Sequence, residues 1–268
     1  MERSIITLTT DFGTKDGYVA VMKGVILNIN PETLIVDISH EIPHHDIVEA
    51  RYIVERTYGY FPEKTIHLAV VDPGVGGTRR PILIITERYM FIGPDNGIFG
   101  FVLHKERVQK IIELTNSKYF LGPISNTFHG RDIFAACAGY ISLGLRPERL
   151  GPEIDSIMQL PDEEPVIKDN GILGRIKHVD RFGNLISNIR KADLEKLMKK
   201  GSVEILVGNK VLRGIRDTYS SVSPGELLAL IGSTDCLEIA VNMGNASDKL
   251  SLKRGDQIIV MLRDERIE

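Results

Sequence analysis

The chain has 268 residues, of which 43% are hydrophobic and 26% charged, and its formal net charge is −3. This length suits one large domain or two modest ones. The mild acidity disfavours nucleic acid as a partner, because nucleic-acid-binding domains usually carry a basic surface. No apolar run approaches the ~20 residues that span a membrane, the N-terminus lacks a signal-peptide layout, and two cysteines make no disulfide framework. We therefore expect a cytoplasmic protein with no membrane partner.

The first half of the chain alternates strand-like and helix-like runs. Strands are predicted at residues 4–10, 33–39, 65–71, 81–86 and 89–93, and helices at residues 16–30, 46–61 and 130–144. This alternation predicts an α/β fold with a largely parallel sheet flanked by helices. In such sheets ligands bind beyond the carboxyl ends of the strands, and Asp11, His40 and Asp72 fall at such ends.

The composition changes between residues 146 and 170, where proline and acidic residues replace the regular pattern. We place a linker at residues 161–170, between an N-terminal domain at 1–160 and a C-terminal domain at 171–268. Beyond the linker, one short helix is predicted at residues 192–200. Strands are predicted at residues 172–180, 184–189, 202–208, 210–215, 226–232, 236–242 and 257–262. Short strands separated by turns favour a small barrel or a sandwich.

The segment VVDPGVGGTRRP is the most specific candidate site. Its glycines permit tight backbone turns, and Arg79 follows Asp72 by seven residues. The segment lacks the Gly-Lys-Ser/Thr of a phosphate loop, and a surface Asp–Arg pair would contribute little to stability. His129, just ahead of a predicted helix, is expected to join Asp72 and Arg79 at the strand ends. Arg80 directly follows Arg79, so the sequence leaves open which guanidinium faces the site.

Other polar clusters have a functional and a structural interpretation. Asp11 is placed to accept hydrogen bonds from a ribose diol, or to cap a turn. Asp180 and Asn184 flank a Phe-Gly turn and are either ligand contacts or ordinary turn residues. His40, His44, His45 and Asp46 are residue types that bind metals, but Asp46 also suits a helix cap.

Six segments in chain order closely resemble the S-adenosyl-L-methionine (SAM) hydrolases, also called SAM hydroxide adenosyltransferases, which are relatives of the bacterial fluorinase and chlorinase. They are LTTDFG, VVDPGVGGTRRP, FIGPDNGIF, TFHGRDIFA, VDRFGNLISNI and LEIAVNMGNAS. The resemblance implies an N-terminal α/β domain, a C-terminal β-barrel and a homotrimer. It further implies that each ligand lies between the N-terminal domain of one subunit and the C-terminal domain of its neighbour.

The resemblance also implies the reaction and its residues. SAM and water would give adenosine and L-methionine, with SAM as the substrate and no cofactor. The catalytic residues would be Asp72, Arg79 and His129. The substrate-binding residues would be Asp11, Asp180, Asn184, Ser233, Val241 and Met243. The halogenases have tyrosine and serine where this chain has His129 and Gly130, which favours water over halide. Thr234 replaces an arginine of the fluorinase.

The expected chemistry is in-line attack of water on the ribose 5′ carbon, with neutral methionine leaving. A guanidinium keeps its proton at ordinary pH, so Arg79 would stabilise charge while Asp72 anchors the water and His129 helps to deprotonate it. One rival interpretation is a metal-dependent hydrolase built on Asp11, Asp37 and the His40–Asp46 cluster. Another is a SAM- or nucleoside-binding sensor without turnover.

Overall fold

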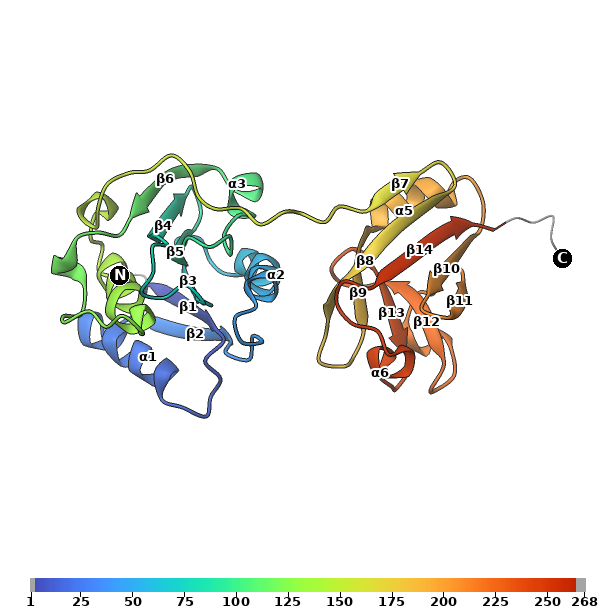
Figure 1. Ribbon diagram of the computed structural model, residues 1–268, viewed down its shortest axis with the longest axis horizontal. Coiled ribbons are helices and arrows are strands. Elements are labelled where there is room, and N and C mark those ends of the chain that lie inside the picture. Colours follow the sequence, from blue (N-terminus) through green and yellow to red (C-terminus); the bar gives the residue numbers. More distant parts are fainter. Residues whose placement is uncertain (1–2, 264–268) are drawn as a thin grey trace. The chain divides into compact units, whose positions relative to one another are not determined.

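A computed structural model describes residues 3–263 (Figure 1). Residues 1–2 and 264–268, at the outer ends of the two expected domains, lie outside the described residues. The chain divides after Leu160 into two compact units. No helix within the described part of the chain is both long and apolar enough to cross a membrane.

The N-terminal unit is built on a six-stranded sheet of order β2-β1-β3-β5-β4-β6. Its strands are β1 Ile5–Thr10, β2 Leu34–Ser39, β3 Ile66–Val70, β4 Pro81–Thr86, β5 Met90–Pro94 and β6 Val108–Glu113. Strands β2, β1, β3 and β5 are parallel to one another, whereas β4 is antiparallel to β5 and β6. The predicted α/β class is confirmed. Strand β6 was not predicted, because its sequence VQKIIE mixes charged with apolar residues and gives a weak strand signal.

Helices on both faces of this sheet bury its apolar side chains. They are α1 Tyr18–Ile29, α2 Ile47–Thr57, α3 Val102–Lys105 and α4 Ala136–Ser142, with short turns η1 Tyr58–Tyr60, η2 Ser117–Tyr119 and η4 Pro147–Arg149. A wide π-type turn, η3 Gly130–Ala135, leads directly into α4. One core joins α1, η3 and α4 to the sheet, and a second core lies beneath α2.

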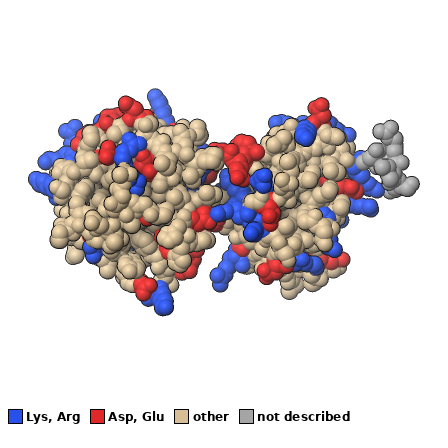
Figure 2. All heavy atoms as spheres, viewed as in Figure 1, with Lys and Arg blue, Asp and Glu red and all other residues tan. Residues whose placement is uncertain are grey.

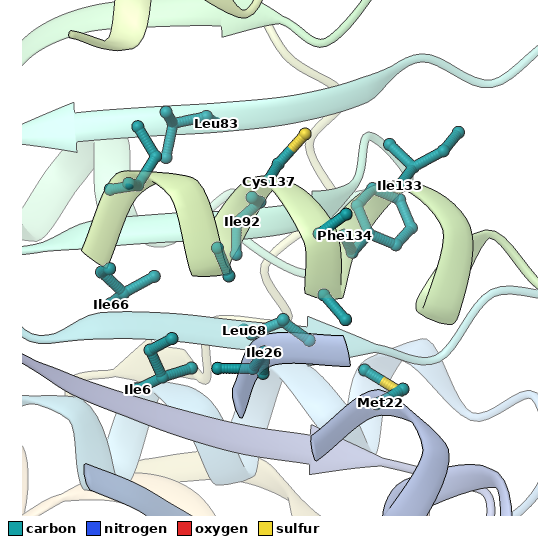
Figure 3. Close-up of a cluster of buried hydrophobic side chains, with 14 of the residues drawn as sticks. Ile6, Met22, Ile26, Ile66, Leu68, Leu83, Ile92, Ile133, Phe134 and Cys137 are labelled. Atoms are coloured by element: carbon teal, nitrogen blue, oxygen red, sulfur yellow. The ribbon is translucent and has the colours of Figure 1, made fainter. Parts of the chain in front are cut away.

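The first core fixes the segment that follows His129. Met22 and Ile26, one turn apart on α1, face the sheet, while Phe134 and Cys137 of η3 and α4 fill the space between helix and strands (Figure 3). Phe134 is fully buried. Burial of such a side chain contributes roughly 1.5–3 kcal/mol. The η3 turn is therefore held rigidly against the sheet by its own apolar side.

The C-terminal unit is an antiparallel, nearly closed barrel, as predicted. Its strand order is β11-β10-β14-β8-β9-β13-β12, with β7 paired to β8. An isolated bridge between Arg216 and Leu230 brings the segment after β11 to β12, which draws the two ends of the sheet together. A large apolar core fills the interior, and Leu228, Leu230 and Ala240 form a small separate cluster. Val166–Lys168, inside the segment expected to be a linker, form β7.

The remaining elements of this unit are the strands β8 Gly171–Val179, β9 Leu185–Arg190, β10 Val203–Val207, β11 Lys210–Arg213, β12 Leu227–Ile231, β13 Cys236–Val241 and β14 Gln257–Leu262. Its helices are α5 Lys191–Met198 and α6 Ala246–Leu250, and η5 Tyr219–Ser221 is a short turn.

Candidate active site

A cavity of about 320 Å³ opens beyond the carboxyl ends of β1 and β3 in the N-terminal unit. Because these strands are parallel neighbours, the residues that follow them, Asp11 and Asp72, arrive at the same edge of the sheet. The loop before η3 supplies the other wall. The cavity is lined by Asp11, Phe12, Asp16, Tyr18, His44, His45, Val70, Asp72, Val75, Thr127, Phe128, His129 and Gly130.

Asp72, Arg79 and His129 form one hydrogen-bonded cluster. Arg79 Nε donates to both carboxylate oxygens of Asp72, at 3.0 and 2.9 Å, and Arg79 Nη2 also pairs with Asp72 Oδ2. The same Nη2 lies 2.8 Å from His129 Nδ1. The Asp72 and Arg79 side chains are 5% and 10% exposed, so their charges interact in a largely water-excluded place.

The contact with Arg79 assigns the proton on the His129 ring. A guanidinium has only donors, so Nδ1 must be the acceptor and the neutral ring carries its hydrogen on Nε2. Burial, and then the charge of Arg79, lower the pKa of His129, against opposing contributions from Asp72 and Asp132. His129 is therefore a neutral ring whose basic nitrogen is already occupied.

The glycine-rich loop makes this contact possible. Gly76 has φ of +74°, a conformation that disfavours any residue with a β-carbon. A β-carbon placed there would also overlap the carbonyl oxygen of Asn126. The loop that carries Arg79 thus packs against the loop that carries His129 at a point where only glycine fits.

The second arginine faces another partner. Arg80 donates from Nε and Nη2 to Asp95 Oδ2, at 2.9 and 2.6 Å, and from Nη2 to the carbonyl of Ser156 at 2.8 Å. Asp95 Oδ1 in turn accepts from the backbone N–H of Met158. Arg79 is therefore the guanidinium that binds the cavity residues Asp72 and His129, and Arg80 fastens residues 156–158 to the same unit.

Asp11 is buried at the cavity wall. Its Oδ2 accepts from the backbone N–H of His45 at 2.9 Å, so the carboxylate holds the loop between β2 and α2. Asp11 thus anchors a loop distant in sequence, which differs from the turn cap of the structural interpretation. Its other oxygen remains available to a ligand hydroxyl.

The histidine-rich segment does not assemble a metal site. His40 lies between Thr10 Oγ1, at 2.8 Å from Nδ1, and Asp37 Oδ1, at 3.0 Å from Nε2. Asp46 caps α2 by accepting from the backbone N–H of Glu49. Among residues 3–263, no group of three or more His, Cys, Asp or Glu side chains is placed to hold a metal ion.

An aromatic wall of the cavity was missed by the sequence reasoning. The rings of Phe12, Tyr18 and Phe128 contact one another, with centroids 5.2 to 5.8 Å apart. Phe12 follows Asp11 and Phe128 precedes His129. This position beside two predicted site residues could have identified the aromatic wall from the sequence. The wall offers an apolar surface to a flat or aliphatic ligand.

In the C-terminal unit, Asp180 and Asn184 form one tight turn between β8 and β9. Asp180 Oδ1 accepts from the backbone of Phe182 and Asn184, and Oδ2 accepts from the Asn184 amide at 2.9 Å. Ser233 is exposed just before β13 and Val241 ends that strand, so these two lie at opposite strand ends. Met243 follows at 87% exposure.

Glu238 in β13 is a further buried carboxyl near this turn. It accepts a hydrogen bond from Tyr219 at 2.7 Å. Burial raises the pKa of Glu238, and the negative charge of Asp180 adds to this effect. Sequence reasoning missed Glu238, although a glutamate inside the otherwise apolar run CLEIAV could have drawn attention to it.

Comparison with known proteins matches both units to one family. Residues 6–151 match the SAM hydroxide adenosyltransferase N-terminal domain, and residues 174–259 match its C-terminal domain. The chain is 35% identical to an (R)-S-adenosyl-L-methionine hydrolase of Methanocaldococcus jannaschii, over 96% of this chain and 95% of that protein. It is 36% identical to one of Thermus thermophilus, over 92% and 95%.

A solved structure is similar throughout. The crystal structure of an uncharacterised conserved protein from Thermotoga maritima superposes with a TM-score of 0.88 at 38% identity. The match covers 96% of this chain and all of that one.

Proposed function

The chain belongs to the SAM hydroxide adenosyltransferase family, and on that premise we propose that it is an enzyme that hydrolyses SAM to adenosine and L-methionine. The observation that carries the proposal is the Asp72–Arg79–His129 cluster, in which Asp72 and His129 line a cavity of ligand size and Arg79 joins them. The relatives named above act on the (R) epimer at sulfur, and we propose the same preference here.

The proposed reaction is a single displacement. A bond forms between the water oxygen and the 5′ carbon, while the carbon–sulfur bond breaks and its electron pair returns to sulfur. The sulfonium becomes the neutral thioether of methionine, and the water releases one proton. Because the leaving group is neutral and needs no general acid, the enzyme acts mainly by holding the water in line and by electrostatics.

The geometry favours Asp72 over His129 as the group that receives this proton. His129 Nδ1 is occupied by Arg79, so the ring presents Nε2–H, which can donate to the water oxygen and orient it. Asp72 Oδ1 accepts from Arg79 Nε and keeps a lone pair for one water hydrogen. An ion-paired carboxylate suffices as acceptor, since a water forming its bond to carbon becomes a strong acid. This role for His129 differs from the base expected from sequence.

The remaining predicted residues would bind the substrate. We propose that the free oxygen of Asp11 accepts from the ribose diol and that the aromatic wall contacts the apolar parts of SAM. We further propose a homotrimer in which Asp180, Asn184, Ser233, Val241 and Met243 of another subunit complete each site. The resemblance to the SAM hydrolases supports this assembly.

The function is tested by incubating the purified protein with each sulfur epimer of SAM in ¹⁸O-labelled water, with and without chloride, fluoride or a chelator. We expect adenosine labelled at the 5′ oxygen, faster release from the (R) epimer, and no effect of chelator. A halogenated nucleoside would indicate a halogenase, and binding without product would indicate a sensor. Loss of activity with chelator, restored by metal, would indicate the metal-dependent alternative.

The shared site is tested by mixing two inactive variants, Arg79→Gln and Asp180→Ala, under conditions that exchange subunits. If each site combines two subunits, about a quarter of the sites in an equimolar mixture hold both intact halves, and activity returns. If each site lies in one subunit, the mixture stays inactive. Light scattering gives the number of copies directly.

The cytoplasm remains our proposed compartment. The burial of both cysteines, Cys137 and Cys236, is compatible with a reducing environment. Fractionation of cells that produce the protein tests this location.

A further inference from the structure

Asp132 is a fully buried carboxylate three residues beyond His129, and none of the roles above uses it. Its Oδ1 accepts from Arg131 Nε at 2.6 Å, and its Oδ2 accepts from Arg131 Nη2 at 3.1 Å and from the backbone N–H of Ser125 at 2.7 Å. Charge-assisted hydrogen bonds of this kind hold a carboxylate in one orientation.

Asp132 ties down the loop before His129 at two points. Its carbonyl accepts from the backbone N–H of Leu121 at 2.8 Å, and its side chain holds Ser125. The next residue, Asn126, places its carbonyl against Gly76. The fit between this loop and the one that carries Arg79 therefore depends on Asp132.

Asp132 also reaches the aromatic wall through its arginine neighbour. The Arg131 guanidinium, held by Asp132, lies over the ring of Phe128 at 5.2 Å. Phe128 lines the cavity and packs edge-on against Phe12 and Tyr18. One buried carboxylate thus supports two walls of the cavity without lining it.

We propose that Asp132 is a positioning residue for the hydrolysis, which fixes residues 121–128 so that His129 meets Arg79 and Phe128 closes the cavity wall. The inference rests on the proposed function. Asp132 acts through the loop and through Arg131, and it does not touch the substrate.

The pKa of His129 provides a second measurement that should respond to Asp132, because several charged groups surround this ring. Arg79 and Asp72 face it from the loop after β3, and Asp132 faces it from η3, while Asp11, Asp16, His44 and His45 line the same cavity. The negative charge of Asp132 raises the pKa of His129 against the lowering effects of burial and Arg79. Neutralising Asp132 should lower that pKa further.

The test compares Asp132→Asn with Asp95→Asn in the full chain. Asp95 is a matched control because it is also buried, and it also accepts from an arginine and from one backbone N–H, but away from the cavity. We expect Asp132→Asn to lower kcat about 10- to 100-fold with a smaller change in KM, and to move the acid limb of the pH profile to lower pH. Asp95→Asn should lower Tm and leave kcat and the acid limb unchanged.

The inference is overturned if Asp132→Asn keeps wild-type kcat and acid limb, or if both variants lose kcat equally. If Asp132→Asn does not fold, Arg131→Met tests the inference instead. This variant keeps the contact between Asp132 and Ser125 and removes the cation over Phe128. We expect about a 3- to 10-fold loss of kcat, and wild-type kcat would overturn the inference. Failure of the proposed function is a separate result, since the wild-type protein would then release no adenosine.

Discussion

Two adjacent arginines make almost the same ion pair and serve different purposes. Arg79 binds a buried aspartate at the cavity and continues to a histidine, whereas Arg80 binds a buried aspartate and continues to backbone groups at residues 156–158. The two arginine side chains are 10% and 35% exposed. The comparison teaches that similar arginine–carboxylate pairs differ by their further contacts, and our proposed catalytic role for the Arg79 pair rests on its contact with His129 beside the cavity.

The strongest test of this comparison replaces each arginine with glutamine. Both changes leave a buried aspartate without its cation, which costs about 3–5 kcal/mol of stability for a fully buried pair and less for the more exposed Arg80 pair. We expect Arg79→Gln to lower kcat/KM for SAM by about 10²- to 10³-fold as well, because it removes the charge beside the water. Arg80→Gln should stay within about threefold of wild type. Equal losses of kcat/KM would contradict the assignment of Arg79.

The next effect comes from the glycine loop on the Arg79 side. Gly76→Val should lower turnover by about 10- to 100-fold, because it pushes the loop off Asn126 and separates Arg79 from His129. Gly144→Val is the control, since Gly144 also has positive φ, at +87°, but has open space around it and lies at the end of α4. Both variants should lose stability in thermal melts. A Gly76→Val protein with intact turnover would argue against this role of the loop.

A smaller effect concerns pH, since only the Arg79 cluster contains a histidine. Burial and the Arg79 charge lower the pKa of His129 below its usual 6.5, so the neutral ring persists to lower pH than in a free histidine. The acid limb of kcat/KM should therefore lie below pH 6.5. The unfolded chain binds this proton at higher pH, so the contribution of His129 to stability also falls as pH drops below 6.5. If the acid limb of kcat/KM lies above pH 6.5 and is unchanged in His129→Gln, the limb belongs to another group.

The smallest effect is local and belongs to the Arg80 side. Asp95→Asn should speed hydrogen exchange at the Met158 amide, because Asp95 Oδ1 accepts from that N–H at 2.7 Å. Asp72→Asn should leave this amide unchanged. Exchange rates measured by mass spectrometry on peptides covering residues 156–160 provide the comparison.

The surface is less informative than these buried pairs. On the visible face of both units, acidic and basic side chains are interspersed (Figure 2). Exposed ion pairs such as Arg107–Glu87 contribute little to stability, which is why our predictions concern buried groups.

The sequence by itself determined the two kinds of domain and the residues at the strand ends. Alternating apolar periods predicted the α/β unit and a barrel or sandwich, because burial of one face imposes the period on the chain. The segments around Asp72 and His129 also pointed to SAM hydrolysis. Asp11 and Asp180 were identified as either ligand-binding or turn residues, and in the structure both accept backbone hydrogen bonds.

Only the tertiary structure decided which arginine binds Asp72 and His129 and which nitrogen of His129 is occupied. Arg79 and Arg80 are neighbours in sequence, yet their side chains reach different partners, Asp72 and Asp95. The aromatic wall and the role of Asp132 likewise depend on contacts between segments distant in sequence, such as Phe12 with Phe128. Local periodicity carries no information on such contacts, since they form only when the packed sheet and helices bring separate loops together.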